Sequence, residues 1–204
     1  MPLLELTGVS KSFGGVQALR GVDFTLDAGQ IHGLAGENGA GKSTMMKIIA
    51  GVHPADAGHV RLDGKEVHFR SSRDARTAGI GMVHQELSVA PELSVAENVF
   101  LGSQPVSRLG VVAWRRMAES AAAQLKNLGL DIDPRARLGD FPIGVQQLVE
   151  LSRVLFSGAR IIILDEPTSA LSPPEIERLF GVLAKLRESG RSMIFISHFL
   201  DDIL

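Results

Sequence analysis

Residues 36–44 combine residue types and a spacing that can hold a chain of phosphate groups. They read Gly-Glu-Asn-Gly-Ala-Gly-Lys-Ser-Thr and match the pattern G-x-x-x-x-G-K-[ST]. Glycines let successive backbone N–H groups turn inward around an anion, and a following helix N-terminus adds partial positive charge. Lys42 is expected to reach the β- and γ-phosphates, and the Ser43 hydroxyl is expected to ligate Mg²⁺. The sequence therefore predicts a site for a nucleoside triphosphate.

The flanking residues favour this interpretation over an exposed turn that happens to carry a lysine. Residues 31–34 predict a short buried strand, and residues 45–50 predict the first turns of a helix. A phosphate-binding loop requires a strand before it and a helix after it.

Two adjacent carboxylates follow a second apolar strand. Residues 161–164 are Ile-Ile-Ile-Leu, and Asp165 and Glu166 come directly after them. Side chains at the carboxyl end of a strand in an open α/β sheet face the ligand crevice. Asp165 fits the Mg²⁺ partner that the loop needs, and Glu166 fits a general base that polarises an attacking water. The alternative is a solvated strand end.

Two further polar residues follow predicted strands, although neither is specific alone. His198 follows the strand 193–196 and could orient the water or contact the γ-phosphate. Gln85 follows the strand 80–84, where a neutral amide could reach both Mg²⁺ and water. The other histidines have no comparable placement and are expected to be bystanders: His32, His53, His59, His68 and His84.

Hydrophobic patterning predicts the elements that position these groups. Segments 3–13 and 16–27 alternate in polarity around Gly14-Gly15 and predict a hairpin. A second hairpin is expected around Asp63-Gly64, with arms 60–62 and 67–69. The remaining expected elements are a helix over 117–128, a strand over 160–164 and a helix over 175–189 that is started by Ser172-Pro173-Pro174. The order predicts an α/β fold: a parallel core sheet with an antiparallel β subdomain and a helical subdomain inserted at about 95–157.

Composition narrows the function classes. The 204 residues suggest a single domain over 1–204, and the formal net charge of −2 gives no support for a nucleic-acid-binding surface. No cysteine is present, so a disulfide framework and a thiolate metal site are excluded. The longest apolar runs are too short to cross a bilayer, so work at a membrane would require a partner.

Together these positions resemble an ABC-transporter ATPase, which implies a P-loop NTPase fold of the ABC type. The resemblance covers essentially the whole chain and rests on the order Phe13, 36–44, Gln85, 141–147, Asp165-Glu166, 169–172 and His198. It narrows to the ATP-binding subunits of ribose-, xylose- and galactose-type monosaccharide importers, through residues 84–87, 93–102, Trp114 and 146–150. In that family two cassettes are fused in one polypeptide, and this chain resembles the N-terminal one.

The resemblance implies a role for each matching residue. Phe13 would stack on the adenine of ATP with Val16 beside it. The phosphates would be held by Gly36, Asn38, Gly39, Ala40, Gly41, Lys42, Ser43 and Thr44. Mg²⁺ would be held by Ser43, Gln85 and Asp165, and the catalytic residues would be Glu166, His198, Gln85 and Lys42.

The resemblance also implies partners and a location. These are a second ABC cassette, a transmembrane permease and, indirectly, a periplasmic sugar-binding protein, with the chain peripheral at the cytoplasmic face of the inner membrane. Nucleic acid is not expected. The segment 88–101 is expected to meet the permease through exposed apolar residues, among them Val89, Leu93 and Val95. The alternative is that these residues pack inside the helical subdomain.

One motif departs from the family. The signature that clamps the γ-phosphate on the opposite cassette usually reads Leu-Ser-Gly-Gly-Gln, and here residues 141–145 read Phe-Pro-Ile-Gly-Val. Only Gly144 remains of its polar core, and Pro142 is expected in the first turn of a helix, where its missing N–H goes unused. Ser172 replaces a common aspartate. The residues for the chain's own nucleotide look intact. The signature residues that would contact the nucleotide of a partner cassette look degraded.

Two other classes of protein remain open. One is a soluble ABC ATPase of DNA repair or translation, and the other is a nucleotide-binding regulatory module with little turnover. A GTPase is disfavoured because no Asn-Lys-x-Asp motif is present. Because the chain stops at Leu204, shortly after His198, it is expected to be a fragment of a longer protein.

Overall fold

The computed structural model describes residues 1–37, 39–108 and 110–197, and the expectations for Asn38 and His198 lie outside these ranges. The chain divides into two compact units. The first unit comprises Met1–Met82, Ala159–Glu166 and Leu186–Leu204, and the second comprises Val83–Gly158 and Pro167–Lys185. Each unit is described by itself below.

An antiparallel sheet opens the first unit and confirms the first predicted hairpin. Its strand order is β2-β1-β4-β5. Strands β1 (Leu4–Phe13) and β2 (Val16–Leu26) pair from Leu4 opposite Leu26 to Phe13 opposite Val16. The turn between them is Gly14-Gly15, and both glycines have positive φ. Phe13 and Val16 therefore lie opposite each other beside this turn.

The second hairpin forms with a different second arm from the one predicted. Strand β4 (Ala57–Leu62) pairs with β5 (Lys65–Glu66), with Leu62 opposite Lys65. Asp63 and Gly64 have φ of 51° and 73°, as a two-residue turn requires. Such a turn pairs the residues directly beside it, so the predicted arm 67–69 was wrong and the strand ends at Glu66.

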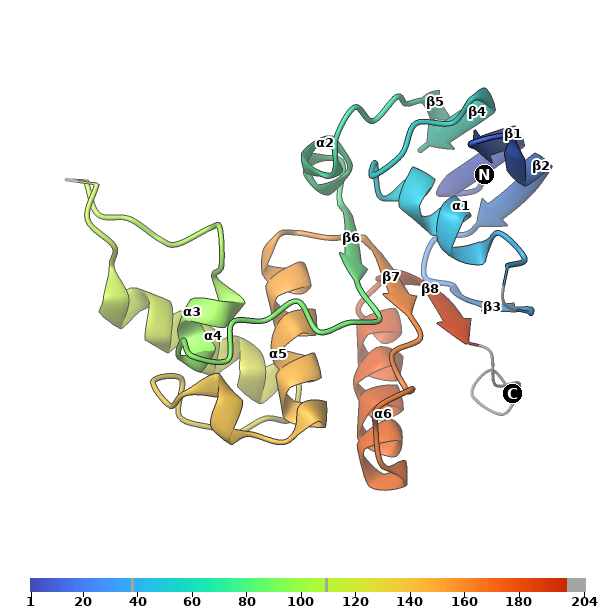
Figure 1. The fold of residues 1–204 in the computed structure, drawn as a ribbon. Helices are drawn as coiled ribbons and strands as arrows, with labels where there is room; N and C mark the ends of the chain where they lie inside the picture. Colours follow the sequence, from blue (N-terminus) through green and yellow to red (C-terminus); the bar gives the residue numbers. More distant parts are fainter. Residues whose placement is uncertain (38, 109, 198–204) are drawn as a thin grey trace. The chain divides into compact units, whose positions relative to one another are not determined.

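A mainly parallel sheet with the order β3-β8-β7-β6 completes the first unit (Figure 1). Its strands are β3 (Ile31–Ala35), β8 (Ser192–Ser197), β7 (Ile161–Asp165) and β6 (Ile80–Val83), whose last residue is assigned to the second unit. Strands β7 and β8 are buried throughout. The prediction that 31–34 is buried was wrong, because β3 is the edge strand of the described sheet and is partly exposed.

Helix α1 (Lys42–Ile49) is anchored by the core of the first unit. Met46 and Ile49 are fully buried, in one apolar cluster with Leu6 of β1 and Ile163 of β7. The short helix α2 (Ser72–Thr77) precedes β6. Packing of α1 against both sheets fixes the start of this helix, where the predicted phosphate loop ends.

The second unit is helical. Its elements are α3 (Val95–Val99), α4 (Trp114–Asn127), the 3₁₀ helix η1 (Leu138–Asp140), α5 (Ile143–Phe156) and most of α6 (Pro173–Glu188). Among the described helices, none is both long and apolar enough to span a membrane.

One helix starts within its predicted start signal, and another differs from its prediction. Helix α6 begins at Pro173, within the signal Ser172-Pro173-Pro174, because proline suits the first turn of a helix. Pro142 precedes α5 as its N-cap instead of standing in its first turn. Its carbonyl oxygen accepts hydrogen bonds from the Val145 and Gln146 N–H groups at 3.0 and 3.1 Å.

Candidate nucleotide site

The predicted phosphate loop runs from the end of β3 to the start of α1 and packs closely against β2. Gly41 is the N-cap of α1, with φ of 83°. A Cβ atom at Gly41 would lie 2.7 Å from both the Ala18 carbonyl oxygen and Leu19 Cδ2. A side chain at this position would therefore push the loop away from β2, in addition to straining the backbone.

Lys42 places its ammonium group inside this loop. The residue is only 8% exposed, and Nζ donates hydrogen bonds to the carbonyl oxygens of Gly36 and of Glu37, the latter at 2.9 Å. Gly39, Ala40 and Ser43 are exposed. The positive charge and the open loop backbone thus lie where a bound phosphate chain would need them.

The carboxylates lie at the same edge of the parallel sheet as the loop. In the sheet register, Ala35 of β3 pairs with Ser197 of β8, and Asp165 of β7 pairs with Ile196 of β8. One strand therefore separates the loop from Asp165, which is 8% exposed. The shared edge brings the two predicted motifs together within the first unit.

Glu166 has an unusual backbone conformation. Its φ is +48°, in the left-handed region that side chains other than glycine rarely adopt. Its N–H donates to the Ile196 carbonyl oxygen at 3.0 Å. Strain of this kind persists where the surrounding structure enforces it, and it concentrates at functional sites.

The residues expected to bind the adenine base of ATP lie beside the β1–β2 turn. Phe13 is 43% exposed and Val16 is 71% exposed, which leaves an aromatic face open to a ligand. The contact of Gly41 with Ala18 and Leu19 ties the same hairpin to the phosphate loop.

His53 also belongs to this region, although no role was predicted for it. Its ring lies edge-on to Phe13, with 5.2 Å between ring centroids and 67° between the planes. The expectation that His53 is a functional bystander stays a prediction, but the ring contact shows that His53 packs against Phe13. No local pattern in the sequence signals a contact between residues forty positions apart.

The oxygen donors of the first unit fit a hard cation. Ser43 supplies a hydroxyl in the first turn of α1, and Asp165 supplies a carboxylate at the sheet edge. Mg²⁺ binds through one or two such protein oxygens together with phosphate oxygens. Gln85, the third predicted ligand, belongs to the second unit and is exposed there.

A buried ion pair on α5 holds the chain shortly after Gln85. The Ser88 N–H donates to Glu150 Oε2 at 3.4 Å, and Arg153 Nη1 donates to the Ser88 carbonyl oxygen at 2.6 Å. Arg153 Nη2 also bonds Glu150 Oε1 at 3.0 Å. Burial raises the pKa of the Glu150 carboxyl even though Arg153 opposes the shift. The sequence did not predict this pair.

The segment predicted to dock a permease is less exposed than expected. Val95 is fully buried, and Val89 and Leu93 are partly buried. Ser94 and Glu97 form a capping box that starts α3 and directs Val95 into the core. The expectation that Val95 is exposed was therefore wrong.

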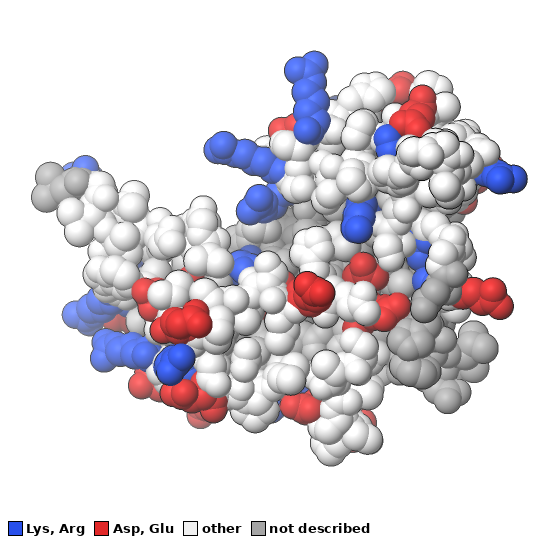
Figure 2. Space-filling model, in the orientation of Figure 1, with Lys and Arg blue, Asp and Glu red and all other residues white. Residues whose placement is uncertain are grey.

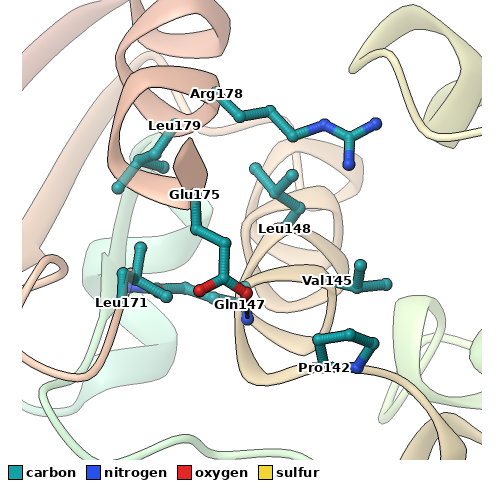
Figure 3. A pocket seen from close by; sticks show the side chains of 9 residues that line it. Pro142, Val145, Gln147, Leu148, Leu171, Glu175, Arg178 and Leu179 are labelled. Atoms are coloured by element: carbon teal, nitrogen blue, oxygen red, sulfur yellow. Dashed lines mark hydrogen bonds between the residues drawn. The ribbon is translucent and has the colours of Figure 1, made fainter. Parts of the chain in front are cut away.

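The degenerate signature borders a pocket of about 190 Å³ between α5 and α6 (Figure 3). Glu175 projects from α6 toward the start of α5, where its Oε1 accepts a hydrogen bond from the Gly144 N–H at 3.1 Å. Its Oε2 accepts bonds from the N–H and the hydroxyl of Ser172 at 2.9 and 2.6 Å. Bonds from Ser172 and Gly144 lower the pKa of Glu175. The glycine that remains of the signature thus donates its N–H to a carboxylate of the same chain.

Known proteins with similar sequences include ATP-binding proteins of ribose import. The chain is 51% identical over 201 residues to the ribose import ATP-binding protein RbsA of Chromobacterium violaceum, covering 98% of this chain and 40% of that protein. It is 49% identical over 202 residues to RbsA 1 of Streptomyces coelicolor, covering 99% of this chain and 40% of that protein. The chain therefore spans about 40% of the length of these relatives.

A solved structure has the same fold. The ADP conformation of MJ1267, an ATP-binding cassette of an ABC transporter, superposes with a TM-score of 0.87 at 27% identity, over 100% of this chain and 84% of that one. The family model described as ABC transporter matches residues 19–169, from β2 past the strained Glu166. Loop, carboxylates, fold and family model agree, and the chain belongs to the ABC transporter family.

Proposed function

We propose that this chain binds MgATP and hydrolyses it as part of the ATP-binding protein of a monosaccharide importer. The observation that carries the proposal is the shared sheet edge. The loop with Lys42 inside it and the pair Asp165-Glu166 are one strand apart in the register of the parallel sheet.

The first unit has a residue for each part of the nucleotide. Backbone N–H groups of the loop and Lys42 would hold the phosphates, with Asn38 among the loop residues. Phe13 would stack on adenine and Val16 would pack beside it. Ser43 and Asp165 would hold Mg²⁺, which neutralises charge on the β- and γ-phosphates when bound.

Glu166 is the proposed general base for the attacking water. Its carboxylate would accept a proton as the water oxygen approaches the γ-phosphorus, while His198 and Gln85 orient that water. The enforced left-handed backbone at Glu166 supports this role, because it directs the side chain away from the course that a regular strand would give it.

The proposed partners follow from the relatives. Because the chain covers about 40% of each RbsA protein, we propose a second ABC cassette elsewhere in the same polypeptide. A transmembrane permease would be the other partner, with a periplasmic sugar-binding protein acting through it. The chain would then lie at the cytoplasmic face of the inner membrane.

Because Val95 is buried, fewer residues of the segment 88–101 could contact the permease. Partly buried Val89 and Leu93 remain available, and they follow Ser88, whose backbone is held by Glu150 and Arg153. Figure 2 shows both basic and acidic side chains on the face that it draws, in keeping with the formal net charge of −2 (Figure 2). A nucleic-acid partner, as in soluble ABC ATPases of DNA repair or translation, has no support from this charge or from the relatives.

Equilibrium titration with MgATP tests the proposal. Lys42→Ala should weaken binding roughly 100-fold, because it removes the charge-assisted bonds to phosphate. Lys47→Ala is the matched control, since Lys47 is an exposed lysine in the last turn of the same helix, and it should bind like the wild type. Equal affinity in Lys42→Ala and Lys47→Ala, or no binding by the wild type, would refute the proposal.

A further inference from the structure

We infer that His53 and the residues after it position the Phe13 ring for the base of the nucleotide. This inference rests on the proposed function and adds a positioning device to it. His53, Lys11 and Asp56 do not themselves need to touch the nucleotide. They fix Phe13 at a set distance from the phosphate loop.

The first contact is between two rings. His53 meets Phe13 edge-on at 5.2 Å, a preferred geometry for aromatic pairs. Phe13 remains 43% exposed, so its ring still has surface open to a ligand. Because the ring is already held on one side, it has little rotational freedom left to lose. Stacking on a nucleobase therefore costs less conformational entropy.

The second contact holds the strand on which Phe13 lies. Lys11 Nζ bonds Asp56 Oδ1 at 2.5 Å and lies 5.4 Å from the Phe13 ring centroid. The Ser12 N–H donates to Asp56 Oδ2 at 2.8 Å, and the Asp56 N–H donates to the Ser10 carbonyl oxygen at 2.9 Å. The end of β1 is therefore bonded to the segment 53–56 at three successive residues.

The same segment is tied to the phosphate loop through α1. The N–H groups of Val52 and His53 donate to the Lys47 carbonyl oxygen at 2.8 and 3.2 Å. Helix α1 begins at Lys42, directly after the loop, and is anchored in the core by Met46 and Ile49. A short path of bonded residues thus runs from the phosphate loop, through α1 and His53, to Phe13.

This arrangement predicts that part of the affinity for MgATP depends on the adenine base. MgATP and magnesium tripolyphosphate are the two probes, because both offer phosphates but only ATP offers a base to Phe13. His53→Leu fills similar space without a ring and should weaken MgATP binding roughly 3- to 10-fold, the weight of one aromatic pair. Tripolyphosphate binding should be unchanged.

Three further variants separate positioning from general structure. His53→Phe restores a ring and should recover wild-type affinity for MgATP. Asp56→Asn removes the ion pair with Lys11 and should weaken MgATP but not tripolyphosphate. His68→Leu is the control at a highly exposed histidine and should change neither ligand. In a double-mutant cycle, His53→Leu should add little to Phe13→Ala, because the His53 effect acts through that ring.

The outcomes are distinguishable. Equal weakening of both ligands by His53→Leu, additive losses in the cycle, or failure of His53→Phe to rescue would overturn the inference. Wild-type protein that binds ATP no more tightly than tripolyphosphate would also overturn it, while leaving the phosphate site in place. Wild-type protein that binds neither probe would overturn the proposed function, and the inference with it.

Discussion

Lys42 and Glu166 divide the proposed work between holding the phosphates and activating the water. Lys42 is nearly buried in the loop and bonds two loop carbonyl oxygens. Glu166 stands at the end of a buried strand in a backbone conformation that the sheet enforces through the Ile196 carbonyl oxygen. Binding and hydrolysis should therefore be separable by single substitutions.

Glu166→Gln should keep MgATP affinity close to that of the wild type and lose roughly 100-fold or more in the rate of hydrolysis. The carboxamide can still bond a water molecule but is a poor base. Single-turnover assays on the proposed longer polypeptide, with protein in excess over radiolabelled ATP, measure this rate without requiring rapid product release. Glu188→Gln, at an exposed glutamate at the end of α6, is the control. Undiminished hydrolysis in Glu166→Gln would remove Glu166 from the role of base.

The placement of the loop and of the two carboxylates at one end of the parallel sheet could be predicted from the sequence, because their motifs are local. The loop 36–44 and the pair Asp165-Glu166 each follow a predicted strand, and the carboxyl ends of parallel strands lie at the same edge of a sheet. His53 and Glu175 could not be predicted in this way. Each acts on a residue thirty or more positions away, and only the folded chain brings the two partners together.

At the scale of elements, helix starts and strand ends decide what each side chain can reach. Ser172 and Glu175 cap α6, and the same carboxylate bonds the first turn of α5 through Gly144. The start of α6 at Pro173 could be predicted from the signal Ser172-Pro173-Pro174, because proline suits the first turn of a helix. The arm of the second hairpin was misplaced because turn geometry, rather than the next apolar residues, sets the register.

The buried Glu150 predicts a dependence of stability on pH. Because burial raises its pKa above the ordinary value of 4.5, the native chain retains a proton that the unfolded chain has lost. The contribution of Glu150 to the free energy of unfolding should therefore be present below pH 4.5 and decline as pH rises through the raised pKa.

Urea unfolding at a series of pH values above 4.5 checks this prediction, with Glu150→Gln as the comparison. The difference in unfolding free energy, wild type minus variant, should fall as pH rises, since glutamine does not titrate. Glu150→Gln also removes the pairing with Arg153, and this loss shifts the difference in unfolding free energy by an offset. The offset does not make the difference fall as pH rises. A difference that increases with pH would mean that Arg153 outweighs burial and that the carboxyl is held ionised.

At the scale of the whole molecule, the chain combines the proposed nucleotide site with a degenerate signature. Pro142 lacks both a hydroxyl and an N–H group, and the Gly144 N–H is bonded to Glu175. Loss of one preorganised donor to a transition-state anion costs about 3 kcal/mol. We therefore expect that two copies of this chain do not supply each other with the usual clamp on the γ-phosphate, and that the proposed second cassette provides it.

Steady-state ATP hydrolysis by the purified chain, measured over a wide range of protein concentration, tests this central claim most directly. MgATP should be bound, as the titration above determines, and yet turnover per chain should stay very low and should not rise with concentration. Brisk hydrolysis whose total rate grows with the square of chain concentration would contradict the account. It would mean that a pair of these chains forms a competent site and that the signature around Pro142 and Gly144 still functions.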